Sequence, residues 1–282
     1  MKILVMGGNR FCGKLVVEYL HSQGHELTVF NRTGTAPVSC EIIQGDRNDK
    51  DILRSSFHNK NYDCIIDMCL YKLEQAEKST PIFVQKTKNY IFISSIAVYK
   101  KTNLFPIGES CPTGKWPLFE DYGVQKSKIE NYLASFNDLC YTILRPTYVI
   151  GKNNHHKREG YYFEKILNNE IVDVEGDGQA ILSFIFVEDL ANIISIFATS
   201  TMADKDVYNI CNDEAITITG FIALISDIIG KKANLNFVDK KVSFKNEHCF
   251  FSNKKIKNHL NYNFITLKHG LEQIYEHEYK IP

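Results

Sequence analysis

The chain has 282 residues, 44% of them hydrophobic, which is enough for one large domain or two modest ones with a buried core. Lys plus Arg equals Asp plus Glu at 33 each, so no overall field draws the chain to nucleic acid or acidic lipid. Met1 leads directly into a strand-like run without a signal peptide, and no apolar stretch approaches the ~18 residues of a membrane span. We therefore expect a cytoplasmic protein.

The cysteines are scattered and show no C-x-x-C spacing. They stand at positions 12, 40, 64, 69, 111, 140, 211 and 249. Most lie in apolar runs, so we expect reduced, buried, unreactive thiols and no bound zinc.

The first half of the chain alternates short β-rich runs with helical patterns. The runs KILVM, ELTVF, SCEIIQG, DCIIDM and NYIFISS alternate with predicted helices over 11–23, 49–58 and 72–85. Strands that are apolar on both faces and alternate with helices predict a parallel sheet covered on both sides. The expected fold class is α/β, a doubly wound parallel sheet of the Rossmann type.

The second half is less regular. A proline-containing loop precedes a predicted helix over 121–136 and the strand CYTILRP, after which come a short helix over 160–168, an isolated strand VYNIC, and helices near 217–229 and 266–278. We predict a nucleotide-binding core over 1–152, completed by 178–212. Residues 153–177 and 213–282 are expected to form a small C-terminal substrate lobe.

The first turn, MGGNRFCG, is typical of a dinucleotide site although its glycine spacing is altered. Gly7, Gly8 and Gly13 can provide the positive φ and the close backbone approach that a pyrophosphate needs at a helix N-terminus. Arg10 stands where the middle glycine is usual, and Phe11 follows it. On the glycines alone, a plain strand–turn–helix remains the alternative.

The end of the second strand bears on the choice of nucleotide. An NAD-preferring site normally has an acidic residue there for the ribose 2′-hydroxyl, whereas this chain has Asn31 and Arg32. Arg10 and Arg32 suit a 2′-phosphate, because guanidinium pairs with phosphate in bidentate geometry. NADP is therefore favoured, with NAD as the alternative. Asp46 and Arg47, after the third strand, are candidates to meet the adenine.

The strongest pattern joins a strand end to a later helix. NYIFISS ends in Ser95, and DYGVQKSKIENYL places Tyr122 and Lys126 four residues apart, on one face of a helix. A lysine cation beside a tyrosine stabilises its phenolate, and a serine hydroxyl can hold a substrate oxygen. Together they can move a proton on a hydroxyl or carbonyl while a hydride passes to or from nicotinamide. A Y-x-x-x-K pair alone is usually an ordinary helix surface.

These motifs, with SSIAVY, GESCP, LRPTYVIG and GDGQAILSFIFVEDLANII, resemble the short-chain dehydrogenase/reductase superfamily in its extended NAD(P)-dependent epimerase/dehydratase branch. The GGxxxxG turn is similar to an atypical subgroup that includes reductases, putative sugar dehydratases and chloroplast stem-loop RNA-binding proteins. The resemblance implies that Ser95, Tyr122 and Lys126 are catalytic and that Pro146 to Val149 wall the nicotinamide. The predicted cofactor contacts are Gly7, Gly8, Arg10, Phe11, Gly13, Asn31, Arg32, Asp46, Arg47, Pro146 and Val149.

Two departures from the family pattern bear on the chemistry. Dehydratases of this branch carry an Asp-Glu pair after the active-site hydroxyl residue, and here Ile96 and Ala97 stand in its place, so 4,6-dehydration is disfavoured. The asparagine that many members carry on the preceding helix is not identifiable. We expect a reductase or epimerase acting on a secondary alcohol or ketone, with a nucleotide sugar as one candidate. The alternative is a non-catalytic dinucleotide-binding scaffold or an RNA-binding protein.

Weaker signals concern the substrate and partners. Further candidate substrate contacts are Ser94, Arg158 and Tyr161. The run His155, His156, Lys157 and Arg158 could grip a phosphate or carboxylate, although such a run is more often only solvated, and KKIKNHLNYNF reads as a basic helix surface. We expect a small-molecule substrate and no membrane or metal, do not favour nucleic acid, and leave a homodimer open.

Overall fold

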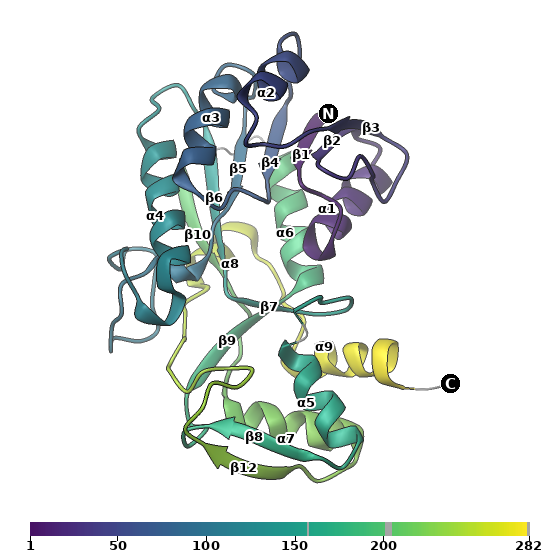
Figure 1. The fold of residues 1–282 in the computed structure, drawn as a ribbon, viewed down its shortest axis with the longest axis vertical. Coiled ribbons are helices and arrows are strands. Elements are labelled where there is room, and N and C mark those ends of the chain that lie inside the picture. The colour runs from purple at the N-terminus through teal and green to yellow at the C-terminus, as the bar shows by residue number, and fades with distance from the viewer. Residues whose placement is uncertain (157, 201–204, 281–282) are drawn as a thin grey trace. The chain divides into compact units, whose positions relative to one another are not determined.

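The computed structural model describes residues 1–156, 158–200 and 205–280 of the chain (Figure 1). The chain divides into two compact units. The first comprises Met1–Asn103, Glu109–Pro146 and Leu190–Ile210, and the second comprises Leu104–Gly108, Thr147–Asp189 and Cys211–Pro282.

The first unit is built on a seven-stranded sheet in the order β10-β6-β5-β4-β1-β2-β3, with every neighbouring pair parallel. Its strands are β1 (Lys2–Met6), β2 (Glu26–Asn31), β3 (Glu41–Gln44), β4 (Cys64–Asp67), β5 (Tyr90–Ile93), β6 (Tyr141–Pro146) and β10 (Asp206–Ile210). Strands β4 and β5 are buried along their whole length, as the continuous apolar runs predict. The predicted doubly wound α/β fold is confirmed.

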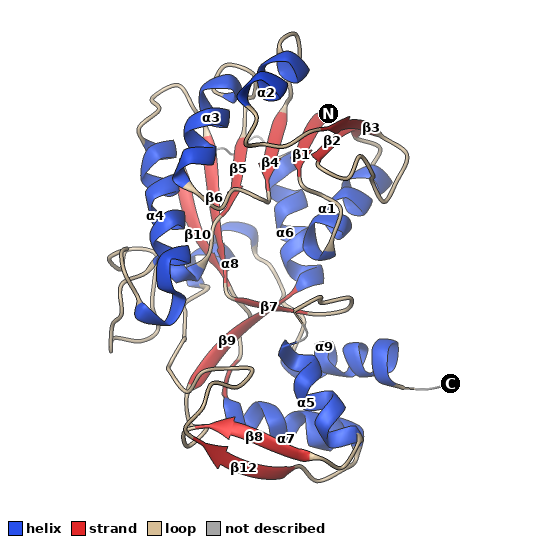
Figure 2. Cartoon of the chain, viewed as in Figure 1, coloured by secondary structure: helices blue, strands red, loops and turns tan. Residues whose placement is uncertain are grey.

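Helices cover both faces of this sheet (Figure 2). They are α1 (Phe11–Ser22), α2 (Lys50–Phe57), α3 (Leu73–Phe83), α4 (Glu120–Ala134) and α6 (Val187–Thr199), of which α6 enters the unit at Leu190. Residues Phe57, Phe83 and Leu133, from α2, α3 and α4, pack in one buried cluster against strand residues that include Ile65 and Phe92. This packing aligns the helix starts with the carboxyl ends of the strands, where ligands bind in such sheets.

The run VYNIC lies in the segment 178–212 that was expected to complete the core, and it joins the large sheet as β10, although it was expected as an isolated strand. VYNIC is not isolated, because β10 pairs with β6 at the edge of the large sheet, in a register that sets Tyr208 opposite Leu144. The boundary between the units also differs from the prediction. Strand β9 (Ile181–Phe186) belongs to the second unit because it pairs with β7 (Tyr148–Ile150) and β11 (Ala215–Thr217).

The second unit has a three-stranded sheet, β11-β9-β7, and a two-stranded parallel sheet of β8 (Ile171–Glu175) and β12 (Asn234–Val238). Its helices are α5 (Arg158–Leu167), α7 (Ile218–Ile229), α8 (Lys254–Leu260) and α9 (Leu267–Ile274), the last continued by a π-helical turn, Tyr275–Tyr279. Aromatic rings fill its core: the Phe184 ring stacks on that of Phe221 with centroids 4.8 Å apart. The short strands of this unit escaped sequence reasoning.

Within the described residues, no helix is long and apolar enough to cross a membrane. All eight cysteines are free thiols, and Cys12, Cys64, Cys211 and Cys249 are buried. Cys140 is exposed, contrary to the expectation of mostly buried thiols.

Candidate active site

Ser95 stands directly after β5, where the chain leaves the sheet. Its Oγ caps the 3-10 turn η1 (Ile96–Val98) by accepting a hydrogen bond of 3.2 Å from the Ala97 amide. Ile96 and Ala97 are both buried. The two residues in the place of the dehydratase acid pair therefore face the interior, and neither carries a group that can transfer a proton.

Helix α4 packs closely against this turn, and Gly123 makes the approach possible. A Cβ added at Gly123 would lie 1.9 Å from the Ala97 carbonyl oxygen, so only glycine fits there. Tyr122 precedes Gly123 in the first turn of α4, and its side chain is 42% exposed. The contact therefore brings the segment that begins at Ser95 beside the start of the helix that carries Tyr122.

Lys126 lies one helical turn beyond Tyr122 and is buried, with 1% of its surface exposed. Its Nζ donates a hydrogen bond of 2.7 Å to the Ile93 carbonyl and stands 5.8 Å from the centroid of the Tyr122 ring. Burial lowers the pKa of Lys126 to about 7, although the charge of Asp67 acts in the opposite direction. The predicted proximity of phenol and ammonium is present in the structure.

A buried ionic network lies behind these residues, and sequence reasoning missed it. Glu130, one turn after Lys126, accepts bonds from Arg145 Nε and Nη2 at 3.0 and 2.5 Å. The Ser94 hydroxyl donates to the same carboxylate at 2.5 Å. Arg145 also donates to the Tyr99 hydroxyl at 2.9 Å. Ser94 was expected to contact substrate, and this is wrong, because the residue is buried and its hydroxyl donates to Glu130.

The glycine turn has the close packing that a phosphate site needs. Gly7 and Gly8 take φ of +109° and +77°, and a Cβ at Gly13 would lie 3.0 Å from the backbone of Gly8. The first turn of α1 can therefore approach the loop closely, as a turn that binds a pyrophosphate at a helix N-terminus requires. Arg10 is the N-cap residue of α1 and is exposed, and Phe11 is the first helical residue, with φ of +44°.

The loop after β2 is fastened to this turn by small polar side chains. Asn9 Nδ2 donates to the hydroxyls of Thr33 and Thr35, at 2.8 Å each. Asn31 Oδ1 accepts from the Gly34 amide at 2.8 Å. These bonds hold in place the loop that carries Arg32, whose side chain is exposed. Asn9 was not identified from the sequence, because a single asparagine in a loop gives no signal.

The prediction for Arg47 is wrong. Its guanidinium turns inward and pairs with Asp67, at the end of β4, through bonds of 2.7 and 2.8 Å. Burial alone would raise the pKa of Asp67, but Arg47 and the Tyr90 hydroxyl at 2.7 Å outweigh it and hold this pKa below its usual value. Arg47 is therefore the counter-ion of a buried carboxylate rather than an adenine contact. Its neighbour Asp46 is half-buried and accepts a hydrogen bond from the Asn48 amide.

The remaining residues that the sequence suggested as cofactor or substrate contacts are distributed over both units. Pro146 ends β6 in the first unit, and Val149 lies in β7 of the second unit. Arg158 starts α5, its guanidinium 5.4 Å from the centroid of the Tyr148 ring. The Tyr161 hydroxyl accepts a bond from the Asp173 amide. His155 and His156 are exposed, and Lys157 lies outside the described residues.

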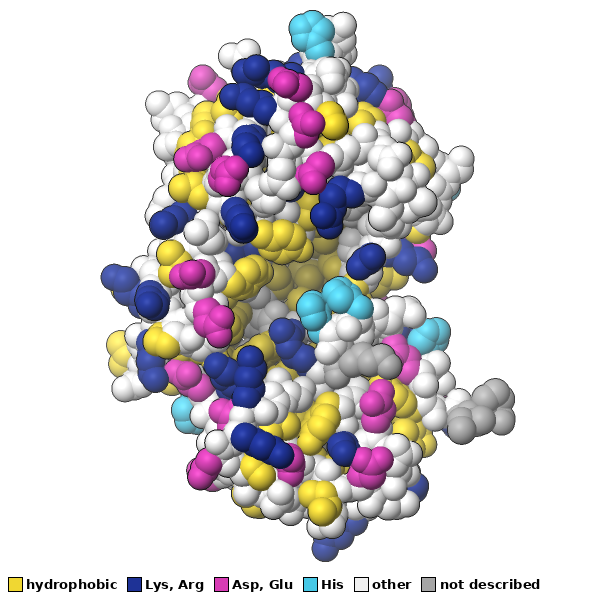
Figure 3. Space-filling view, in the orientation of Figure 1, with side chains coloured by type: hydrophobic (Ala, Val, Ile, Leu, Met, Phe, Trp, Pro, Cys, Tyr) yellow, Lys and Arg dark blue, Asp and Glu magenta, His cyan; other side chains and the backbone are white. Residues whose placement is uncertain are grey.

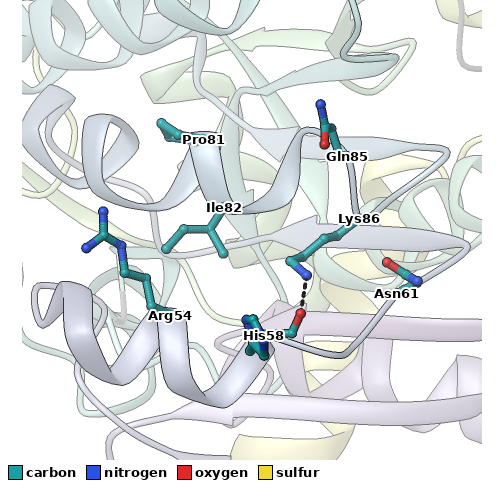
Figure 4. Close-up of a pocket in the computed structure, with 7 residues that line it drawn as sticks. All are labelled: Arg54, His58, Asn61, Pro81, Ile82, Gln85 and Lys86. Atoms are coloured by element: carbon teal, nitrogen blue, oxygen red, sulfur yellow. Dashed lines mark hydrogen bonds between the residues drawn. The ribbon is translucent and has the colours of Figure 1, made fainter.

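A surface hollow of about 480 Å³ lies elsewhere on the first unit, between the ends of α2 and α3 (Figure 4). Its lining is Arg54, His58, Asn61, Pro81, Ile82, Gln85 and Lys86. Lys86 Nζ donates to the His58 carbonyl at the carboxyl end of α2, so this cation offsets a helix terminus. The hollow borders the segments that lead into β4 and β5, whereas Ser95 follows the carboxyl end of β5, so it is not part of the candidate site.

The sequence profile of the NAD dependent epimerase/dehydratase family matches residues 3–84 and 76–211, which is most of the chain. The chain belongs to this family. The family expected from the motifs is thus confirmed, and its description is of an NAD-dependent family.

Several relatives and solved structures are similar to the chain. Chloroplast stem-loop binding protein of 41 kDa b from Arabidopsis thaliana is 26% identical, covering 91% of this chain and 73% of its own. A putative UDP-glucose 4-epimerase from Methanocaldococcus jannaschii is 29% identical over an alignment that covers 67% of this chain and 70% of the relative. UDP-glucose 4-epimerase of Thermotoga maritima, solved with UDP-glucose, superposes with a TM-score of 0.83 at 20% identity, covering 98% of both chains. At that identity the solved structure shows a shared fold only.

Proposed function

We propose that this protein is an NAD(P)-dependent reductase or epimerase that moves hydride between nicotinamide and a secondary alcohol or ketone. The observation that carries the proposal is Lys126, buried on α4 one turn from the exposed Tyr122. Nucleotide sugars are the first substrates to test, because several relatives are named UDP-glucose 4-epimerases. Without a proton-transferring residue at position 96 or 97, 4,6-dehydration is not proposed.

The residues fit a dinucleotide, since the turn is packed closely enough that a Cβ at Gly13 would lie only 3.0 Å from the backbone of Gly8. The turn and the start of α1 would hold the pyrophosphate, and the nicotinamide, when bound, would accept or supply the hydride. Tyr122 would take the proton from the substrate hydroxyl or return it. Protonated Lys126 would favour the phenolate of Tyr122, and Ser95 would hold the substrate oxygen.

Replacing Tyr122 with Phe tests this assignment. We expect turnover of UDP-glucose or another alcohol or ketone in a substrate panel to fall roughly 10²-fold or more, because the acid/base group is lost. Tyr132→Phe, on the same helix, is the matched control and should keep wild-type rates. Turnover that survives in Tyr122→Phe with an unchanged circular dichroism spectrum would remove Tyr122 from the mechanism.

The cofactor preference proposed is NADP over NAD. Asn31 leaves no carboxylate at the end of β2, and exposed arginines stand on both adjoining loops, Arg10 and Arg32. One charge-assisted bond is worth roughly 1.5–3 kcal/mol, which predicts at least about a tenfold tighter Kd for NADPH than for NADH. Calorimetric titration of Arg10→Ala/Arg32→Ala should show weaker NADPH binding and nearly unchanged NADH binding. Arg54→Ala, in α2, is the control, and equal wild-type affinities would point to NAD.

A second candidate function is a dinucleotide-binding scaffold that binds structured RNA, favoured by the relative named as a stem-loop binding protein. On the face drawn in Figure 3, however, basic and acidic side chains are interspersed rather than gathered by sign. Fluorescence anisotropy with a labelled RNA hairpin distinguishes the two. Submicromolar hairpin binding at physiological salt, together with no turnover on the panel, would favour the scaffold.

A further inference from the structure

The ammonium of Lys126 lies among aromatic rings from three separate segments. Its Nζ is 4.7 Å from the centroid of Phe92 on β5, 5.1 Å from that of Tyr71, and 5.8 Å from that of Tyr122 on α4. The face of an aromatic ring carries partial negative charge and attracts such a cation. The two carboxylates near Lys126 each form an ion pair with an arginine, Asp67 with Arg47 and Glu130 with Arg145. The aromatic rings are therefore important neighbours of this ammonium.

Tyr71 differs from the other rings in its position. Phe92 is fully buried in the sheet, whereas Tyr71 belongs to the loop between β4 and α3 and is 50% exposed. It is therefore a solvent-facing ring with a completely buried ammonium close to it. If this ring were removed, water could reach Lys126 from the side of the loop.

The backbone beside Tyr71 is held firmly. The Tyr71 and Lys72 amides both donate to Gln75 Oε1, at 2.9 and 3.1 Å. The Leu73 amide donates to Gln125 Oε1 at 3.0 Å, and Gln125 directly precedes Lys126 on α4. The loop is thus tied to the helix at the residue next to the lysine, which sets the ring where it lies.

We propose that Tyr71 is a positioning residue that covers the Lys126 ammonium, keeps water from it and holds it beside Tyr122. This proposal rests on the proposed function, which assigns Lys126 the role of stabilising the Tyr122 phenolate. The cover is made by the ring and not by the hydroxyl, so phenylalanine should replace tyrosine here, and a small side chain should not. The groups of fixed sign that face Lys126 are Asp67, Arg47 and Glu130, and the ionisable thiol of Cys69 also faces it. Truncating Tyr71 leaves all four in place.

The test measures how fast Lys126 reacts with acetic anhydride as a function of pH, by mass spectrometry of its peptide, with no substrate needed. Wild type and Tyr71→Phe should react slowly, with a midpoint near the lowered pKa of about 7. Tyr71→Ala should react roughly tenfold faster or more at its plateau, with the midpoint shifted towards the ordinary lysine value, because water then solvates the cation. Lys128, exposed on the same helix, is the internal control and should be unchanged.

Equal plateau rates and midpoints in Tyr71→Ala and wild type would overturn the proposal. A shift in Tyr71→Phe as large as that in Tyr71→Ala would also overturn it. If Tyr71→Ala alters Lys128 as well, Tyr71→Ser, also with a small side chain, replaces it, with the same expected outcome. The labelling experiment requires no turnover. Its outcome can therefore contradict the role of Tyr71 independently of whether the Tyr122→Phe experiment contradicts the proposed function.

Discussion

Glu130 and Arg145 form an ion pair in the interior of the first unit, with 6% and 5% of their side chains exposed. Such a pair contributes little net stability when complete, but removing one partner leaves an uncompensated buried charge. Burial alone would lower the pKa of Arg145, yet the hydrogen bonds and the charge of Glu130 outweigh burial and raise this pKa. A guanidinium is so basic that proteins do not deprotonate it, so Arg145 stays charged if its partner is lost. The pair also fastens α4 to the strand end through Ser94.

We expect Glu130→Gln to lower the free energy of unfolding by roughly 3–5 kcal/mol, because Arg145 is left without its counter-ion. The double variant Glu130→Gln/Arg145→Met should recover part of this loss, since the buried charge is gone. Urea unfolding monitored by circular dichroism measures both. A double variant no more stable than Glu130→Gln would show that volume and packing, rather than charge, dominate at this position.

Helix α4 combines structural and chemical roles, because its first turn both packs on η1 and carries Tyr122. Gly123→Ala would normally stabilise a helix by about 1 kcal/mol. Here the added Cβ would collide with the Ala97 carbonyl, and backbone on both sides cannot yield as a flexible side chain can. We therefore expect lower stability, by roughly 1–3 kcal/mol, and at least a tenfold loss of turnover as Tyr122 moves relative to Ser95. Lys128→Ala, exposed on the same helix, should change neither property, and Gly123→Ala with wild-type turnover would refute the close approach.

The stability of the whole molecule depends on pH through two buried carboxylates whose pKa values are shifted in opposite directions. Asp67, in the first unit, has a lowered pKa, so its contribution is present above its ordinary value of 3.8 and lost as the pH falls through the folded-state value. Asp189, in the second unit, is buried and accepts bonds from Tyr262 and the Ile265 amide. Burial outweighs these bonds and raises its pKa to about 6. The stabilisation that Asp189 contributes to the folded state is therefore fully present below about pH 4 and is lost as the pH rises through 6.

Asp189→Asn should remove this second dependence, because the amide does not titrate. Relative to the variant, wild type should lose on the order of 2 kcal/mol of stability between pH 4 and pH 7. Urea midpoints at both pH values measure the difference, and any change in hydrogen bonding at position 189 adds only an offset that is independent of pH. Parallel pH profiles for the two proteins would mean that Asp189 titrates normally in the folded state.

The fold class, the glycine turn and the proximity of Tyr122 to Lys126 could be predicted from the sequence because all three rest on local patterns. Continuous apolar runs between helical segments indicate buried parallel strands, and the glycines of the first turn and the spacing of Tyr122 and Lys126 are properties of neighbouring residues. The helix boundaries came within a few residues for the same reason: α4 spans Glu120–Ala134 where 121–136 was expected.

Tertiary packing decided the rest, because it pairs residues far apart in the chain. Nothing near Arg47 reveals that it will meet Asp67, 20 residues on, and become a buried counter-ion instead of a nucleotide contact. The partnership of β10 with β6 and the cover of Lys126 by Tyr71 arise in the same way. A buried charge requires a partner of opposite sign, but which one it finds depends on the chain crossings, and these are set by the sheet order and not by the local sequence.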